Sequence, residues 1–237
     1  MLKDHPGGTV WRADLLGRPC VLKCLPLAGP RRWAQARLHT SPAWRHWRQA
    51  RWLRAHGFST AETWAIVRGT RDGQPVECLI MQHLPGESVL EHMAMPNLPA
   101  SAQRHVAEAV ARLACRLAHE GRVNRDAKPS NLIVTSLHQT GAHLAMIDCA
   151  DLRRCPRDDE AAVVRMLASG AIEPMGVGFT SRRAVQMRAV RAAAETLDPQ
   201  NPKALARRLW RQVAAAVRAH GDPTPKDNPL RSHPAAP

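Results

Sequence analysis

Four polar side chains lie close together in this 237-residue chain, in an arrangement suited to chemistry. They are Asp126, Lys128, Ser130 and Asn131, and an apolar β-branched run follows them directly. Further along, the short apolar stretch from Leu144 ends in a carboxylate, Asp148. Phosphoryl transfer requires a carboxylate that orients a hydroxyl, a cation near the moving group, and an amide plus a carboxylate that hold Mg²⁺. The sequence therefore predicts phosphoryl-transfer chemistry.

The N-terminal part reads mainly as β-structure around a second lysine. Residues 7–25 alternate in polarity on either side of a turn at 16–19, which predicts a β-ribbon with Lys23 on its second strand. Residues 28–41 read as a loop with about one helical turn, and residues 43–56 as a helix capped by Ser41 and ended by Gly57. Residues 62–67 and 76–81 are predicted to be two further strands.

The remainder reads mainly as helices. A Pro-Gly linker after Gln82 leads to a short helix over 88–92, and the apolar spacing over 101–120 predicts an amphipathic helix that leads into the polar loop. Further helices are expected over 158–168, 180–196 and 202–219. From Gly221 onward the recurring prolines predict a disordered tail.

Composition indicates the type of partner and the compartment. The formal charge of +14 favours polyanions such as nucleotides or an anionic lipid surface, although a general excess of Arg in an Ala- and Arg-rich chain explains it equally well. Nucleic acid is not favoured, because the basic residues are not interleaved with exposed aromatic residues. With no membrane-length apolar run and no signal peptide, a cytoplasmic protein is expected. The six scattered cysteines are expected to be buried free thiols rather than disulfides or zinc ligands.

The order Asp-x-Lys-x-x-Asn followed by a strand and Asp148 resembles the catalytic and metal-binding loops of the protein-kinase-like fold. The resemblance implies an α+β bilobal fold, with a small antiparallel β N-lobe over 1–84, a mainly helical C-lobe over 85–220 and a Pro-rich tail over 221–237. It further implies that the nucleotide is bound by five residues, which are Gly7, Gly8, Lys23 and, through backbone groups that contact adenine, Gln82 and Leu84.

Other stretches narrow the resemblance. The opening Gly-Gly-Thr-Val-Trp, the Trp- and Arg-rich segment that ends at Phe58, and Ile147–Arg154 in place of Asp-Phe-Gly look like the lipopolysaccharide core kinase family, the bacterial Kdo and heptose kinases. Membership would imply ATP- and Mg²⁺-dependent phosphorylation of a sugar hydroxyl of a glycolipid at the cytoplasmic face of the inner membrane. The protein would then contact that anionic membrane peripherally.

Carried over residue by residue, the resemblance gives each polar residue a role. Asp126 would orient and deprotonate the sugar hydroxyl, and Lys128 would neutralise charge on the γ-phosphoryl group. Asn131 and Asp148 would hold Mg²⁺, and Lys23 would bind the nucleotide phosphates.

The sequence departs from the kinase pattern in three places. Asn124 replaces the His that usually precedes Arg-Asp, and Ala150 stands where Asp-Phe-Gly has Gly. The helix that should supply a Glu partner for Lys23 has none, because residues 24–61 contain no Asp or Glu, and His46 lies near the expected position.

These departures leave two alternatives open beside a glycolipid kinase. One is a pseudokinase or basic binding module that retains the fold without turnover. The other is a serine/threonine protein kinase, although no Ala-Pro-Glu follows Asp148 and Ile172-Glu173-Pro174 is only a faint echo of it.

Overall fold

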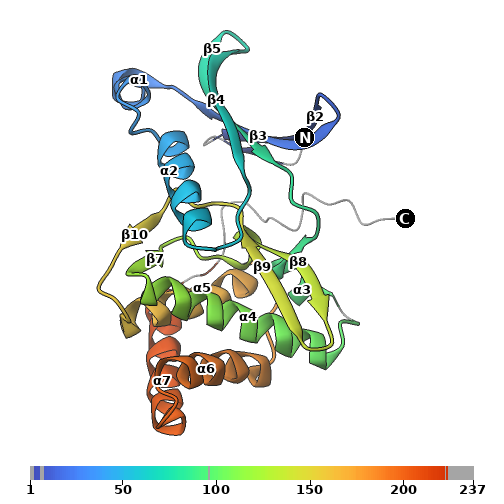
Figure 1. The fold of residues 1–237 in the computed structure, drawn as a ribbon, viewed down its shortest axis with the longest axis vertical. Helices are drawn as coiled ribbons and strands as arrows, with labels where there is room; N and C mark the ends of the chain where they lie inside the picture. Colours follow the sequence, from blue (N-terminus) through green and yellow to red (C-terminus); the bar gives the residue numbers. More distant parts are fainter. Residues whose placement is uncertain (1–2, 6–7, 96, 222, 224–237) are drawn as a thin grey trace. The chain divides into compact units, whose positions relative to one another are not determined.

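A computed structural model describes residues 3–5, 8–95, 97–221 and 223. The described chain is α+β, as expected, and divides into two compact units (Figure 1). Among the described residues, unit 1 comprises those up to Pro85 together with 146–151, and unit 2 comprises 86–145 and those from Leu152. The short segment 146–151 therefore belongs to the N-terminal unit, although it lies far along the chain.

Unit 1 contains a five-stranded antiparallel sheet. Its strands follow the order β1-β2-β3-β5-β4, with bounds β1 Lys3–His5, β2 Gly8–Leu15, β3 Arg18–Pro26, β4 Thr63–Arg71 and β5 Gln74–Gln82. The predicted strands are confirmed, and the second pair is longer than expected. Two-residue turns join β2 to β3 and β4 to β5. The turn residues, Leu16, Gly17, Asp72 and Gly73, all have positive φ, as required in the hairpin turns whose twist matches that of the strands.

Two helices accompany this sheet. Helix α1, Gly29–Arg37, lies where only a loop with one helical turn was expected, so that prediction was wrong. Its Pro30 falls in the first turn, where the missing N–H has no helical partner in any case. Helix α2, Pro42–Ala55, confirms the other prediction: the hydroxyl of Ser41 accepts a hydrogen bond from the N–H of Trp44 at 3.4 Å. Ala43 of α2 packs with Leu79 and Met81 of β5 in the unit 1 core.

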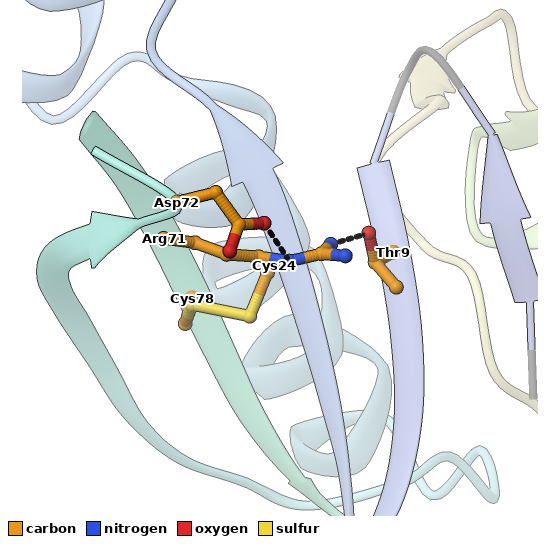
Figure 2. The surroundings of a disulfide bond; sticks show 5 residues. All are labelled: Thr9, Cys24, Arg71, Asp72 and Cys78. Carbon is orange, nitrogen blue, oxygen red and sulfur yellow. Dashed lines mark hydrogen bonds and ion pairs between the residues drawn. A yellow bond between two sulfur atoms is a disulfide. The ribbon is translucent and has the colours of Figure 1, made fainter. Parts of the chain in front are cut away.

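A disulfide joins the neighbouring strands β3 and β5 of this sheet, contrary to the expectation of free thiols. Cys24 of β3 and Cys78 of β5 are direct cross-strand partners with a Cα–Cα distance of 4.1 Å. Figure 2 shows the bond beside Arg71, which pairs with Asp72 and hydrogen-bonds to Thr9. The prediction failed because the strand register, which sequence spacing does not reveal, places these two sulfurs together. The four other cysteines are free.

The described part of unit 2 contains five α-helices, α3 Val89–Ala94, α4 Ala100–His119, α5 Glu160–Gly176, α6 Arg183–Leu197 and α7 Pro202–His220. Ser88 caps α3 in a capping box with Glu91. Helix α4 begins after Pro99, so Ser101 lies inside it and is not the predicted cap. Helix α5 extends well past the predicted end at 168 and contains Pro174. The core includes Leu117, Val163, Val190 and Leu209, all at most 2% exposed.

The strands of unit 2 hold the polar loop. A three-stranded sheet has the order β6-β8-β9, with β6 Glu87–Ser88, β8 Leu132–His138 and β9 Gly141–Met146, and β7 Arg122–Asn124 pairs with β10 Leu152–Arg154. The short 3₁₀ helix η1, Pro129–Asn131, leads into β8. Strand β9 ends at Met146, two residues before Asp148, and not at Asp148 as predicted.

Close packing explains one glycine of the linker. Gly86 has a φ of +114°, and a Cβ there would overlap the carbonyl oxygen of Val134 in β8. Only glycine fits this approach, so β6 can pair with β8 directly after the linker.

The predicted disordered tail, 221–237, lies outside the described residues except for Gly221 and Pro223. Among the helices described, none combines the length and apolar character needed to cross a bilayer.

Candidate functional site

Lys23 and Asp148 form a direct ion pair in unit 1. The Lys23 Nζ donates a hydrogen bond to Oδ2 of Asp148 at 2.6 Å, and both side chains are 26% exposed. Lys23 lies on β3 opposite Leu79 of β5, on the face that Val21 and Leu25 share by strand alternation. Two residues singled out separately in the sequence, 125 positions apart, are therefore brought into contact.

Asp148 is positioned by contacts between its own segment and the residues before β4. The N–H of Met146 donates to the carbonyl of Ser59 at 3.0 Å, and the Thr60 hydroxyl donates to the carbonyl of Met146 at 2.6 Å. Thr60 also lies 3.4 Å from the sulfur of Cys149. Thr60 is buried and was missed by sequence reasoning, because nothing in its local sequence indicates a long-range contact.

His46 of α2 supports the same segment. It is 2% exposed, and its Nδ1 accepts a hydrogen bond from the N–H of Cys149 at 3.3 Å and lies 3.8 Å from Oδ1 of Asp148. In the described part of the chain, its buried Nε2 has no hydrogen-bond partner. His46 therefore contacts the Asp148 segment, while Lys23 finds its acidic partner in Asp148 instead of in α2.

The surroundings of Asp148 keep it ionised. Burial raises the pKa of this carboxyl, but the neighbouring His46 and the ammonium group of Lys23 outweigh burial and hold the pKa well below its usual value. The N–H of Ala150 adds a long hydrogen bond to Oδ1 at 3.4 Å. Asp148 is thus ionised at neutral pH, with its charge balanced by Lys23.

The residues expected to bind nucleotide all belong to unit 1 where they are described. Gly8 begins β2 with a φ of +147°, and a Cβ there would lie 2.7 Å from the carbonyl oxygen of Cys24, so this position requires glycine for strand packing. Gly7 lies outside the described residues. The N–H of Gln82 already donates to the carbonyl of Glu62 at 2.8 Å, so it is not free for adenine. Leu84 packs against the unit 1 core.

The polar loop of unit 2 is held by two asparagines that flank Asp126. The buried Asn124 at the end of β7 accepts a hydrogen bond from the N–H of Asp126 at 3.0 Å through its Oδ1. Asn131 of η1 donates from Nδ2 to the carbonyl of Asp126 at 3.0 Å and to its Oδ2 at 2.9 Å. Asn124 thus supports the loop by hydrogen bonding. The amide oxygen of Asn131 is used in neither bond.

Lys128 completes this network. Its Nζ lies 2.7 Å from Oδ1 of Asp126, with side-chain exposures of 51% for Lys128 and 32% for Asp126. Both oxygens of Asp126 are therefore engaged, although a carboxylate oxygen can accept a second hydrogen bond.

Glu173 of α5 fixes the turn between Lys128 and Asn131. It accepts hydrogen bonds from the backbone N–H of Ser130 at 2.8 Å and from its hydroxyl at 2.6 Å. Glu173 is 9% exposed, and burial raises its pKa even though the Ser130 bonds and Lys128 act in the opposite direction. The sequence singled out Ser130 but gave Glu173 no role, since the contact spans 43 residues.

The site residues therefore form two groups. In unit 1, Lys23 contacts Asp148, and in unit 2, Asp126 contacts both Lys128 and Asn131. The expected metal ligands Asn131 and Asp148 belong to different units. Within the described ranges, no cluster of three or more His, Cys, Asp or Glu side chains is arranged to hold a metal ion.

Comparison of the chain with protein-family models and with curated proteins yielded no match to either.

Proposed function

We propose that this protein is a phosphotransferase of the protein-kinase-like fold, which uses ATP and Mg²⁺ to phosphorylate a hydroxyl of a sugar or glycolipid. The Lys23–Asp148 contact carries the proposal. A strand lysine and a carboxylate that follows a distant strand are the pair expected to bind the nucleotide phosphates and the metal. Chance would rarely bring these two residues together across 125 positions.

The loop of unit 2 supports the same chemistry independently. Asp126 is ionisable, half-buried and fixed through its backbone and its side chain, so its carboxylate is oriented before any substrate binds. In the proposed reaction it accepts the proton of the attacking hydroxyl. The exposed ammonium of Lys128 offsets the negative charge that develops on the transferred phosphoryl group.

The donor atoms suit Mg²⁺, which prefers oxygen ligands. Asp148 remains ionised, and the amide oxygen of Asn131 is not used in the bonds to Asp126. In the proposed function each of these oxygens is a candidate ligand for the metal, which would neutralise charge on the nucleotide phosphates when bound. Lys23 would exchange Asp148 for phosphate oxygens, and its short, charge-assisted bond is the contact that nucleotide must replace.

One observation favours the second candidate, a pseudokinase or binding module. Lys23 has Asp148 as its partner and α2 supplies His46 where a Glu is expected, so the metal carboxylate is already occupied by a protein cation. The position of Glu173 bears on the third candidate. Glu173 belongs to the stretch that faintly resembles Ala-Pro-Glu, and it binds Ser130 in the polar loop. This contact does not favour a protein kinase over a kinase that acts on a sugar.

The test separates binding from transfer. Thermal unfolding is measured with millimolar Mg·ATP for the wild type, Lys23→Ala and Asp148→Asn, with Lys203→Ala and Asp72→Asn as exposed controls matched in charge change. Stabilisation of the wild type and both controls, lost in the two site variants, is expected. Transfer of the γ-phosphoryl group from labelled ATP to an inner-core glycolipid is then measured beside a generic protein substrate.

Each outcome distinguishes the candidates. Glycolipid labelling that Asp126→Asn abolishes supports the proposal. Labelling of the protein substrate alone supports a protein kinase, and Mg·ATP binding without transfer to either acceptor supports a pseudokinase. Absence of any stabilisation by Mg·ATP contradicts the proposed function.

A further inference from the structure

Unit 2 contains a cavity of about 570 Å³, which we call the helical cavity. Helices α3 to α7 all contribute to its wall, and so do Ala127, Pro129 and Leu132 beside the polar loop. The volume lies within the range of about 300–1,000 Å³ typical of small-molecule sites. No role described so far for unit 2 uses this cavity.

The wall of the helical cavity is mostly aliphatic. Val106 and Val110 of α4, Val185 and Val190 of α6, and Val213 and Val217 of α7 line it. Met93, Met95 and Met175 also line it, and their unbranched, polarizable side chains adapt to ligands of differing shape. Met175 is 39% exposed, a high value for a large apolar side chain, so apolar surface extends to the opening. This wall suits a flexible hydrocarbon chain.

The charged groups of the wall are cationic. Arg182, which precedes α6, and Arg218, near the end of α7, both line the cavity and are both exposed, so they lie at its opening. Within the described part of the chain, neither guanidinium group forms an ion pair, and no Asp or Glu is among the lining residues. Guanidinium groups on the wall that no carboxylate neutralises attract an anionic group.

A polar atom inside the wall also lacks a partner. His92 of α3 lines the cavity with its side chain only 13% exposed, and its buried Nδ1 has no hydrogen-bond partner among the described residues. Buried polar groups without partners are uncommon in folded proteins, and a bound ligand or water that completes the hydrogen bonding is one explanation. Three features therefore coincide: an aliphatic wall, a cationic opening and an unpaired histidine nitrogen.

We propose that the helical cavity binds a single-chain anionic amphiphile of the long-chain fatty acid type, with its alkyl chain against the valine and methionine side chains and its head group at Arg182 and Arg218. A peptide or a second copy of the chain is a poorer fit. Either would bring backbone N–H and C=O groups that the aliphatic part of this wall leaves unpaired. Binding does not depend on the proposed phosphotransferase activity, so the two proposals fail separately.

The test measures binding of dodecanoate to the full chain by calorimetry, below its micellar concentration, with decanoate and dodecyltrimethylammonium for comparison. We expect one saturable site and an affinity about 15-fold higher for dodecanoate than for decanoate, because two more methylene groups are buried. The cationic amphiphile is expected to bind about tenfold more weakly than dodecanoate. Arg182→Ala with Arg218→Ala should remove this preference, whereas Arg207→Ala with Arg211→Ala should not.

Variants that fill the cavity locate the site. Ala189→Trp places a large side chain in the wall on α6 and should abolish binding, and Ala184→Trp, exposed on the same helix, should leave it unchanged. Val217→Trp provides a second filling variant should Ala189→Trp fail to fold by circular dichroism.

Three outcomes would overturn the proposal. The first is no saturable binding of dodecanoate by the wild type, and the second is equal affinity for both head groups. The third is wild-type self-association that Ala189→Trp abolishes, which would assign the cavity to a second copy of the chain.

Discussion

Ser130 donates two hydrogen bonds to one buried carboxylate, Glu173, through its backbone N–H at 2.8 Å and its hydroxyl at 2.6 Å. The two donors bind different oxygens, so the carboxylate fixes both position and orientation of the turn. Because Ser130 lies between Lys128 and Asn131, α5 thereby sets the conformation of the loop that holds Asp126. Glu173 acts through Ser130 and is a positioning residue.

Replacing Glu173 by Gln should therefore impair transfer more than nucleotide binding. The amide nitrogen cannot accept a hydrogen bond, so one Ser130 donor loses its partner, at a cost of about 1–3 kcal/mol in the free energy of unfolding. We expect a lower kcat for the proposed transfer with an unchanged Kd for Mg·ATP, measured beside the exposed control Glu195→Gln. Equal losses in both quantities would assign Glu173 a general structural role.

The same residue should give stability a distinctive pH dependence. Burial raises the pKa of Glu173, so the folded protein binds this proton more tightly than the unfolded chain does. Its contribution to stability is complete below the ordinary Glu pKa and is lost as the pH rises through the raised value. Denaturant unfolding across mildly acidic pH should show this decline in the wild type and not in Glu173→Gln. Identical profiles for the two proteins would refute the raised pKa.

Asp148 should show the opposite dependence. Lys23 and His46 lower its pKa, so its contribution to stability is present above the ordinary Asp pKa and is lost as the pH falls toward the lowered value. Asp148→Asn should remove this part of the acid sensitivity and leave Lys23 without an acidic partner. Asp72→Asn, 86% exposed, serves as the control and should unfold with acid like the wild type.

Asp126→Asn should lose the proposed base together with one of the two contacts that the carboxylate oxygens accept, those from Lys128 and Asn131. The amide is isosteric, whereas proton acceptance by a positioned carboxylate accelerates such reactions about 10²–10⁴-fold. We expect a loss of transfer in that range with Mg·ATP stabilisation retained, measured by labelled-phosphate transfer and thermal shift. Full activity in this variant would remove Asp126 from the mechanism, even if nucleotide binding were confirmed.

The Cys24–Cys78 bond should be detectable by chemistry and by stability. Thiol titration of the denatured, unreduced protein should give the four free cysteines, and a count of six would contradict the disulfide. The bond closes a sequence separation of 54 residues, so its reduction should lower the free energy of unfolding by about 2–4 kcal/mol. Stability of Cys24→Ala with Cys78→Ala should not respond to reductant.

Local signals predicted the local structure well. Turn residues and alternation located β2 and β3, and Ser41 with Gly57 located α2, because turns and caps depend on neighbouring residues. The wrong predictions of helix boundaries involve residue types that occur both at helix ends and within the first helical turn. Gly29-Pro30 reads as a helix breaker but begins α1, and Ser101 reads as a cap but lies inside α4.

The sequence placed some residues of the candidate site together but did not reveal their contacts. Asp126, Lys128 and Asn131 are near in sequence, so they were expected on one loop, and the structure adds the contacts among them. The partners of Lys23 and Ser130 could not be read in this way. Asp148 and Glu173 reach them through strand register and helix packing, which depend on the whole fold. That Asp148, and not a residue of α2, is the acidic partner of Lys23 became evident only in the three-dimensional structure.

The ion pair of Lys23 and Asp148 links the two ligands of the proposed reaction. Nucleotide phosphates must draw Lys23 away from Asp148, and a metal ion must draw Asp148 away from Lys23, so either event removes the competitor of the other. The free-energy cost of breaking the Lys23–Asp148 ion pair is therefore incurred only once when both ligands bind. ATP and Mg²⁺ should therefore bind with positive coupling, and by thermodynamic reciprocity each raises the affinity for the other by the same factor. Lys23→Met, which removes the competing cation, should weaken this coupling.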